Sequence, residues 1–87
     1  MIKETIGHSV REFVIDNFLY GQGNVTDQES FLQSGLIDST GVLELVTFLE
    51  DRFEIAIADE ELIPDNLDSI DRLVTFIDQK LQELKAN

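Results

Sequence analysis

The sequence contains no cysteine, only one histidine and only six basic residues. Without cysteine, the chain cannot form disulfides, thiolate zinc sites or a thiol nucleophile of its own. His8 is the single histidine, so no nucleophile, base and orienting residue form a catalytic set, and we expect no intrinsic enzyme activity. Calcium-binding loops are absent as well, because neither "DNLDSID" nor "DEELIPD" has the required ligand spacing and central glycine.

Long apolar segments are also missing. The longest uninterrupted apolar run has four residues, at 55–58, whereas a membrane-spanning helix needs about 20. The opening residues "MIKETIGHSV" do not form a signal peptide, and we therefore expect a cytoplasmic protein without a membrane span. A chain of 87 residues, 43% of them hydrophobic, predicts one folded domain, residues 1–87, with one modest core.

Acidic residues dominate the charge of the chain. Eighteen acidic and six basic residues give a net charge of −12. Between Asp38 and Asp71 there are eleven acids and one base, Arg52, so that segment alone carries −10. Such a field repels nucleic-acid phosphates and anionic lipids and attracts basic protein surfaces, although acidity can also serve solubility alone. We therefore expect basic protein partners and no nucleic acid.

Three segments have apolar residues at helical spacing, and they predict an all-α fold. They lie at about 2–19, from near Ser39 to Phe53, and at about 69–84. A short fourth helical turn is expected at 58–62. We predict a small four-helix bundle, with three main amphipathic helices and one short helix.

The connections between these segments carry three further expectations. The long loop after the first helix should be pinned to the core by Phe31 and Leu32. The short turn should be broken by Pro64 together with the residues that follow it. The segment "FEIAIAD" alternates briefly as a strand would, and it is the main argument against an entirely helical protein.

The helix that begins near Ser39 has two distinct faces. Its predicted buried face carries Val42, Leu45, Val46, Leu49 and Phe53. Its opposite, polar face carries Thr40, Glu44, Thr47 and Asp51. Leu43 lies on the boundary and should be partly exposed.

Ser39 itself has two possible roles. A serine at the start of a helix can accept a hydrogen bond from a free first-turn amide, and this capping role needs no further function. Ser69 lies in nearly the same local setting, after an aspartate and before an apolar helix. Capping alone therefore cannot distinguish the two serines.

The segment "GLIDSTGVLELV" resembles the phosphopantetheine attachment site of acyl carrier proteins. That site is approximately G-x-D-S-L-x-x-x-E-L-V, and it is matched here by Gly35, Asp38, Ser39, Glu44, Leu45 and Val46. The run "FLEDRFEIAIADEELIPDNLDSIDRLVTFI" resembles the end of the second helix, the short third helix and the fourth helix of such a domain, whereas the first helix agrees mainly in length and amphipathicity. The resemblance implies a discrete carrier with a 4′-phosphopantetheine arm on Ser39, whereas Ser69 is only a helix cap.

The same resemblance implies the partners of the chain. A separate phosphopantetheinyl transferase with a magnesium ion would move the arm from coenzyme A, and Asp38 would support that complex, cap the helix, or do both. A loading enzyme, for example an adenylating ligase, would then attach an acyl group as a thioester. Basic surfaces of synthases or transferases would dock on Thr40, Leu43, Glu44, Thr47 and Asp51 of a monomeric carrier, which we place in fatty-acid, other lipid or polyketide metabolism.

Two residues depart from the family pattern. Thr40 replaces the leucine that usually follows the modified serine, and Gly41 stands where an acid is frequent. A specialised carrier is one explanation, and free variation at Thr40 is the other. Two further readings remain open at this stage, namely an aminoacyl or peptidyl carrier and, from another class, an unmodified acidic helical adaptor.

Overall fold

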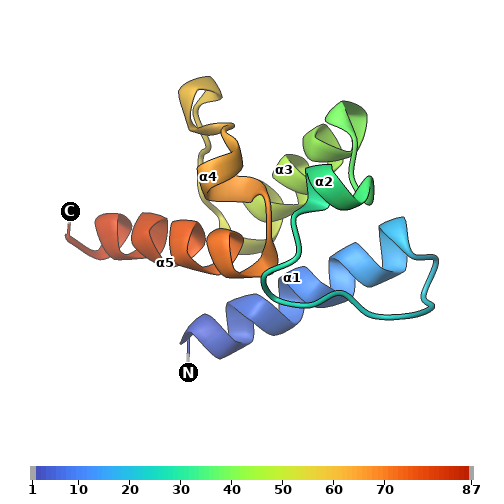
Figure 1. The fold of residues 1–87 in the computed structure, drawn as a ribbon. Coiled ribbons are helices and arrows are strands. Elements are labelled where there is room, and N and C mark those ends of the chain that lie inside the picture. The colour runs from blue at the N-terminus through green and yellow to red at the C-terminus, as the bar shows by residue number, and fades with distance from the viewer. Residues whose placement is uncertain (1, 87) are drawn as a thin grey trace.

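The computed structural model describes residues 2–86, and all regular structure within them is helical (Figure 1). The elements, in chain order, are α1 (Ile2–Phe18), α2 (Phe31–Ser34), α3 (Ser39–Phe53), the 3-10 helix η1 (Asp59–Glu61), α4 (Pro64–Leu67) and α5 (Ile70–Ala86). The predicted all-α bundle is confirmed. Met1 and Asn87, which the predicted domain includes, lie outside the described residues.

One apolar face from each long helix builds the core. α1 and α5 pack against each other, and α3 completes the bundle (Figure 1). The side chains that are less than 2% exposed on these helices are Ile6, Val10, Val14, Leu45, Leu49, Leu73 and Ile77. They recur at intervals of four residues, so each helix presents one stripe to the others, and burying each side chain contributes about 1.5–3 kcal/mol.

The connection after α1 contains a helix that the sequence did not predict. Ser30 caps α2, because its hydroxyl accepts a hydrogen bond from the Gln33 N–H at 3.1 Å. Phe31 enters the core at 2% exposure, as predicted, but Leu32 is 52% exposed, and its predicted role as a core anchor is wrong. The two residues are adjacent on a helical turn, so their side chains point in directions about 100° apart.

The segment "FEIAIAD" forms no strand. α3 ends at Phe53, and Glu54 follows it in the left-handed conformation with φ of 54°. Ile55 is buried, and the N–H of Ile57 donates to the Glu50 carboxylate at 2.9 Å. The alternation therefore reflects which side chains of this connection face the core. The Glu50 carboxylate, and not a neighbouring strand, accepts the hydrogen bond from the Ile57 backbone.

Pro64 begins a helix as well as following one. η1 ends at Glu61, but Pro64 occupies the first turn of α4, which the sequence reading missed. Proline is favoured there because its fixed φ suits a helix. It also loses no hydrogen bond, since a backbone N–H at this position has no acceptor within the helix. The Glu61 carboxylate accepts hydrogen bonds from the Ala58 N–H and from Lys80, both at 2.9 Å. These two donors lower the pKa of Glu61 below its usual 4.5, the backbone N–H of Ala58 having the larger effect.

Candidate functional site

Ser39 is the first residue of α3, and its hydroxyl is exposed and not used for capping. Asp38 is the cap, because its carboxylate Oδ1 accepts a hydrogen bond from the Gly41 N–H at 2.8 Å. Within residues 2–86 the Ser39 hydroxyl has no hydrogen-bond partner. The structure therefore gives the capping role to Asp38 and leaves the Ser39 hydroxyl available on the surface.

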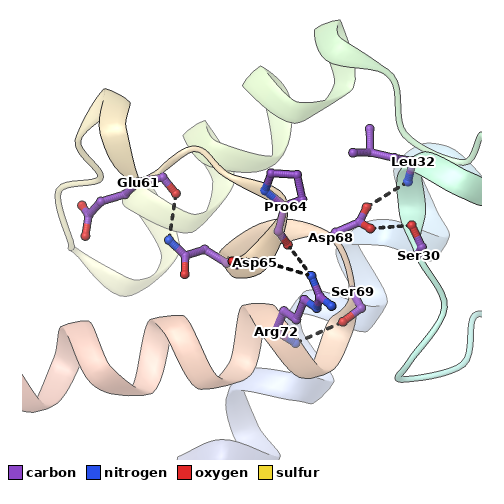
Figure 2. Close-up of polar contacts among 9 residues, drawn as sticks. Ser30, Leu32, Glu61, Pro64, Asp65, Asp68, Ser69 and Arg72 are labelled. Atoms are coloured by element: carbon purple, nitrogen blue, oxygen red, sulfur yellow. Dashed lines mark hydrogen bonds and ion pairs between the residues drawn. The ribbon is translucent and has the colours of Figure 1, made fainter.

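Ser69 has the opposite environment. It is only 4% exposed, and its hydroxyl accepts a hydrogen bond from the Arg72 N–H at 3.2 Å (Figure 2). The predicted capping role of Ser69 is confirmed. The two Asp-Ser sequences look alike, but only Ser39 offers a hydroxyl to another molecule.

The loop before Ser39 is fixed by its own hydrogen bonds and by one buried side chain. Gly35 ends α2 in the left-handed region, with φ of 74°, which glycine adopts without strain. The N–H groups of Leu36 and Ile37 both donate to the carbonyl oxygen of Phe31, at 3.0 and 3.4 Å. Ile37 is 2% exposed, so the residue two positions before Ser39 is anchored in the core. Ser39 is thus exposed on a well-supported segment.

A carboxylate from the junction of α4 and α5 ties down α2. Asp68 accepts a hydrogen bond from the Ser30 hydroxyl and another, at 2.9 Å, from the Leu32 N–H (Figure 2). Its backbone carbonyl also accepts a hydrogen bond from the Phe31 N–H at 2.9 Å. Arg72 supports the other side of this junction through the carbonyl of Pro64, at 3.2 Å. These bonds hold α2 and α4 in a fixed relation beside the start of α3.

An apolar cavity of about 380 Å³ opens beside Ser39, between α2, α3 and α4. Its lining residues are Phe31, Leu32, Ile37, Ser39, Val42, Leu43, Leu45, Leu62, Ile63, Pro64, Leu67 and Asp68. The volume falls at the lower end of the range for small-molecule sites, and nearly all of the lining is hydrophobic. The sequence analysis did not predict the wall formed by Leu62, Ile63 and Leu67, because these residues lie in and beside short helices that have no periodic pattern.

The predicted docking residues lie on the exposed side of α3. Thr40, Glu44, Thr47 and Asp51 are all exposed, and Leu43 is 61% exposed. This stripe begins next to Ser39 and follows the length of the helix. The exposure agrees with the helical positions, and the docking role itself stays a prediction.

The structure assembles no metal site or membrane span in the part of the chain that it describes. His8 is exposed and pairs with Glu12 at 2.8 Å, one helical turn away. Residues 2–86 contain no cluster of three or more His, Asp or Glu side chains that could bind a metal ion. None of the helices described is long and apolar enough to cross a membrane.

Comparison with known proteins identifies the family. No protein-family model matches the sequence. The chain is 35% identical over 81 residues to the acyl carrier protein of Exiguobacterium sibiricum, which corresponds to 93% of this chain and 100% of that protein. It is 32% identical over 72 residues to an acyl carrier protein homolog of Mycoplasmopsis pulmonis, covering 83% of this chain and 96% of the other.

A solved structure agrees with these relatives. The crystal structure of an acyl carrier protein from Thermotoga maritima matches with a TM-score of 0.75 and 26% identity, over 97% of this chain and 95% of that one. The chain belongs to the acyl carrier protein family.

Proposed function

We propose that this chain is a discrete acyl carrier, not an enzyme, and that Ser39 bears a 4′-phosphopantetheine arm. The observation that carries the proposal is that Asp38, and not Ser39, caps the start of α3. Asp38 satisfies the first-turn amide of Gly41, at 2.8 Å, so the Ser39 hydroxyl is exposed and free to react. When bound, the arm supplies the thiol that holds an acyl group as a thioester and that the cysteine-free chain lacks.

The residues around Ser39 suit such a group. A phosphodiester at Ser39 places an anion at the N-terminus of a 15-residue helix. The macrodipole and the unpaired amides of a first turn favour an anion there, by about 0.3–1 kcal/mol. The buried Ile37 keeps the attachment point in place while a transferase acts on it.

The cavity beside Ser39 suits the cargo. Its lining from α2, α3 and α4 is almost entirely apolar, and Ser39 itself forms part of the rim. A hydrocarbon chain attached near Ser39 would be removed from water there, with about 25 cal/mol gained per Å² of apolar surface buried. This supports acyl cargo over a charged aminoacyl group. Leu32 and Leu43, both exposed at the rim, would be the first side chains to meet it.

The exposed stripe of α3 suits rapid exchange between partner enzymes. Glu44 presents a carboxylate near the modified end of α3 and Asp51 presents one near the other end, and basic partner surfaces would be steered toward them. These partners would include the phosphopantetheinyl transferase, a loading enzyme such as an adenylating ligase, and the enzymes that accept the acyl group.

Intact-mass measurement tests the attachment. The purified chain is incubated with coenzyme A, magnesium and a phosphopantetheinyl transferase of broad specificity. We expect the mass of one phosphopantetheine to be added to wild type and to Ser69→Ala, and none to Ser39→Ala. Ser69→Ala is the matched control because it removes the hydroxyl of the other Asp-Ser sequence. A wild-type chain that stays unmodified, or a modified Ser39→Ala, would overturn the proposal.

A second experiment concerns specialisation. Thr40 is exposed next to Ser39, where family members usually have a leucine that offers partners more apolar area. We propose that this difference restricts the carrier to dedicated enzymes. Acyl transfer by general fatty-acid synthesis enzymes is measured on the modified wild type and on modified Thr40→Leu. The variant should be the better substrate, and equal rates would show that Thr40 does not set specificity.

A further inference from the structure

Tyr20 stands out because neither the backbone nor the core explains it. It has a φ of 56°, in the left-handed region that glycine adopts easily and bulky residues rarely adopt. Its side chain is 85% exposed, more than any other large hydrophobic residue in the described part of the chain. A glycine would suit this backbone better, and nothing in the core would lose a contact. The packing of the molecule therefore gives the ring no evident use inside it.

The turn that holds Tyr20 is well defined. The N–H of Gly21 donates to the carbonyl of Ile15 at 2.9 Å, and the N–H of Gln22 donates to the carbonyl of Leu19 at 3.0 Å. These bonds close the C-terminal end of α1 and fix the direction of the backbone at Tyr20. The ring is thus presented to solvent by an ordered turn.

Tyr20 lies at the same end of the molecule as Ser39. Figure 1 shows the C-terminal end of α1 beside the connection between α2 and α3. The contact is close, because a Cβ atom at Gly41 would lie only 2.8 Å from Cε1 of Phe18. Tyr20 is two residues from Phe18 and Ser39 is two residues from Gly41, and each pair spans at most about 7 Å. With the reach of the Phe18 ring included, Tyr20 and Ser39 therefore lie within about 25 Å of each other.

This distance fits within one protein interface. A standard interface buries about 800 Å² on each partner, a patch roughly 30 Å across. The transferase that modifies Ser39 must touch the Ser39 hydroxyl, so its footprint is fixed on this end of the molecule. The apolar side chain of Leu43, 61% exposed beside Ser39, would fall within the same patch.

The charge of this region indicates the chemistry of the partner surface. Residues 12–51, which run from α1 through α3, contain eight acids and no lysine, arginine or histidine, and one of the acids, Asp27, pairs with Arg11. A partner surface complementary to this region is basic. Tyrosine suits such a surface, because an arginine side chain can stack on the aromatic ring while it pairs with neighbouring carboxylates.

We propose that Tyr20 is a recognition residue for the phosphopantetheinyl transferase, packing against a basic, ring-binding site on that enzyme. The inference rests on the proposed modification of Ser39. The docking surface for the transferase would then include the C-terminal end of α1 as well as the exposed stripe of α3.

The test is steady-state kinetics with coenzyme A and a phosphopantetheinyl transferase of broad specificity, with the carrier as the varied substrate. For Tyr20→Gly we expect KM to rise about tenfold, the size of effect seen when an interface aromatic is truncated, with kcat unchanged. The melting temperature of Tyr20→Gly should equal or exceed that of wild type, because glycine relieves the left-handed backbone. Tyr20→Phe, which keeps the ring, should stay close to wild type.

Leu84→Ala is the matched control. Leu84 is also an exposed hydrophobic residue, at 55%, but it lies near the C-terminal end of α5, far from the α2–α3 connection (Figure 1). Its KM should not change. An unchanged KM for Tyr20→Gly, or a marked fall in its melting temperature, would overturn the inference while the modification of Ser39 stands. A wild-type chain that is never modified would overturn the proposed function and this inference together.

Discussion

The hydroxyl of Ser30 donates a hydrogen bond to the carboxylate of Asp68, which lies 38 positions further along the chain (Figure 2). The bond joins the cap of α2 to the junction of α4 and α5. Because α2 and α4 form two walls of the cavity, this single contact links the stability of the fold to the shape of the site.

Removing either side of this contact should destabilise the protein. We expect Ser30→Ala and Asp68→Ala each to lower the free energy of unfolding by about 1–2 kcal/mol, since hydrogen bonds to charged groups contribute more than neutral ones. In the double variant the two effects should be less than additive, as measured by urea unfolding. Ser34→Ala is the control, because the Ser34 hydroxyl makes only long local bonds, donating to the Phe31 carbonyl at 3.3 Å and accepting from the Leu36 N–H at 3.4 Å. Strict additivity would contradict a direct interaction.

The cap of α3 can be tested independently of the modification. Asp38→Ala removes the acceptor for the Gly41 N–H and should lower the free energy of unfolding by about 1 kcal/mol. Asp51→Ala, at the other end of α3, removes the same charge without removing a cap and should have little effect. Equal losses in the two variants, measured by thermal or urea unfolding, would mean that net charge and not capping is responsible.

Two glycines within helices should respond to alanine in opposite ways. A Cβ atom at Gly41 would lie 2.8 Å from Phe18 and 2.9 Å from Ile37, so Gly41→Ala should destabilise the protein despite alanine's better helix propensity. At Gly7 the nearest atom, on Val74, would be 3.5 Å away, an ordinary contact. Gly7→Ala should therefore stabilise by up to about 1 kcal/mol. If both variants are stabilised, Phe18 and Ile37 can move aside without loss.

Glu61 should make stability depend on pH in the acidic range. The hydrogen bond from the Ala58 N–H, and then Lys80, lower its pKa in the folded state below 4.5. The lowered pKa means that this stabilisation is complete above about pH 4.5 and declines as pH falls through the folded-state value. Thermal unfolding is measured for wild type and Glu61→Gln between about pH 6 and about pH 3. Wild type should be the more stable protein at the higher pH, and the difference in stability should shrink as the pH falls. Glu60→Gln is the control, because it removes an exposed carboxylate one residue away and leaves the hydrogen bonds of Glu61 in place.

Charge reversal on α3 should slow partner association. Glu44→Lys and Asp51→Lys lie on the exposed face, so folding should persist while the KM of the transferase for the carrier rises several-fold at low salt. The difference should shrink at higher ionic strength, because salt screens exposed charges. Glu83→Lys, an exposed acid near the end of α5, makes the same change in net charge outside the exposed stripe of α3. If all three variants behave alike, the docking face lies elsewhere.

The long helices could be predicted from the sequence because their signal is local and periodic. Apolar residues repeat at helical spacing in α1, α3 and α5, and each stripe forms part of the core. The motif around Ser39 could be found for a similar reason, since its residues lie within one short segment. The exposed face of α3 followed directly from the position of each residue around the helix.

The short elements could not be predicted in this way. α2 and α4 have four residues each, too few for a periodic pattern, and α2 depends on Asp68, which is remote in the sequence. The adjacent Phe31 and Leu32 could not be separated into buried and exposed from their hydrophobicity alone.

The sequence by itself determined the all-α class, the acidic surface and the two candidate serines, because composition and local spacing are sufficient for these. The family motif already favoured Ser39 over Ser69, and the tertiary structure added the physical difference between them, through the burial of Ser69 and the capping of α3 by Asp38. It also brought Leu62, Ile63 and Leu67 beside Ser39 to enclose the cavity, and it brought the end of α1 to the same site. These are contacts between residues far apart in the chain, and packing, not local propensity, decides which of them form.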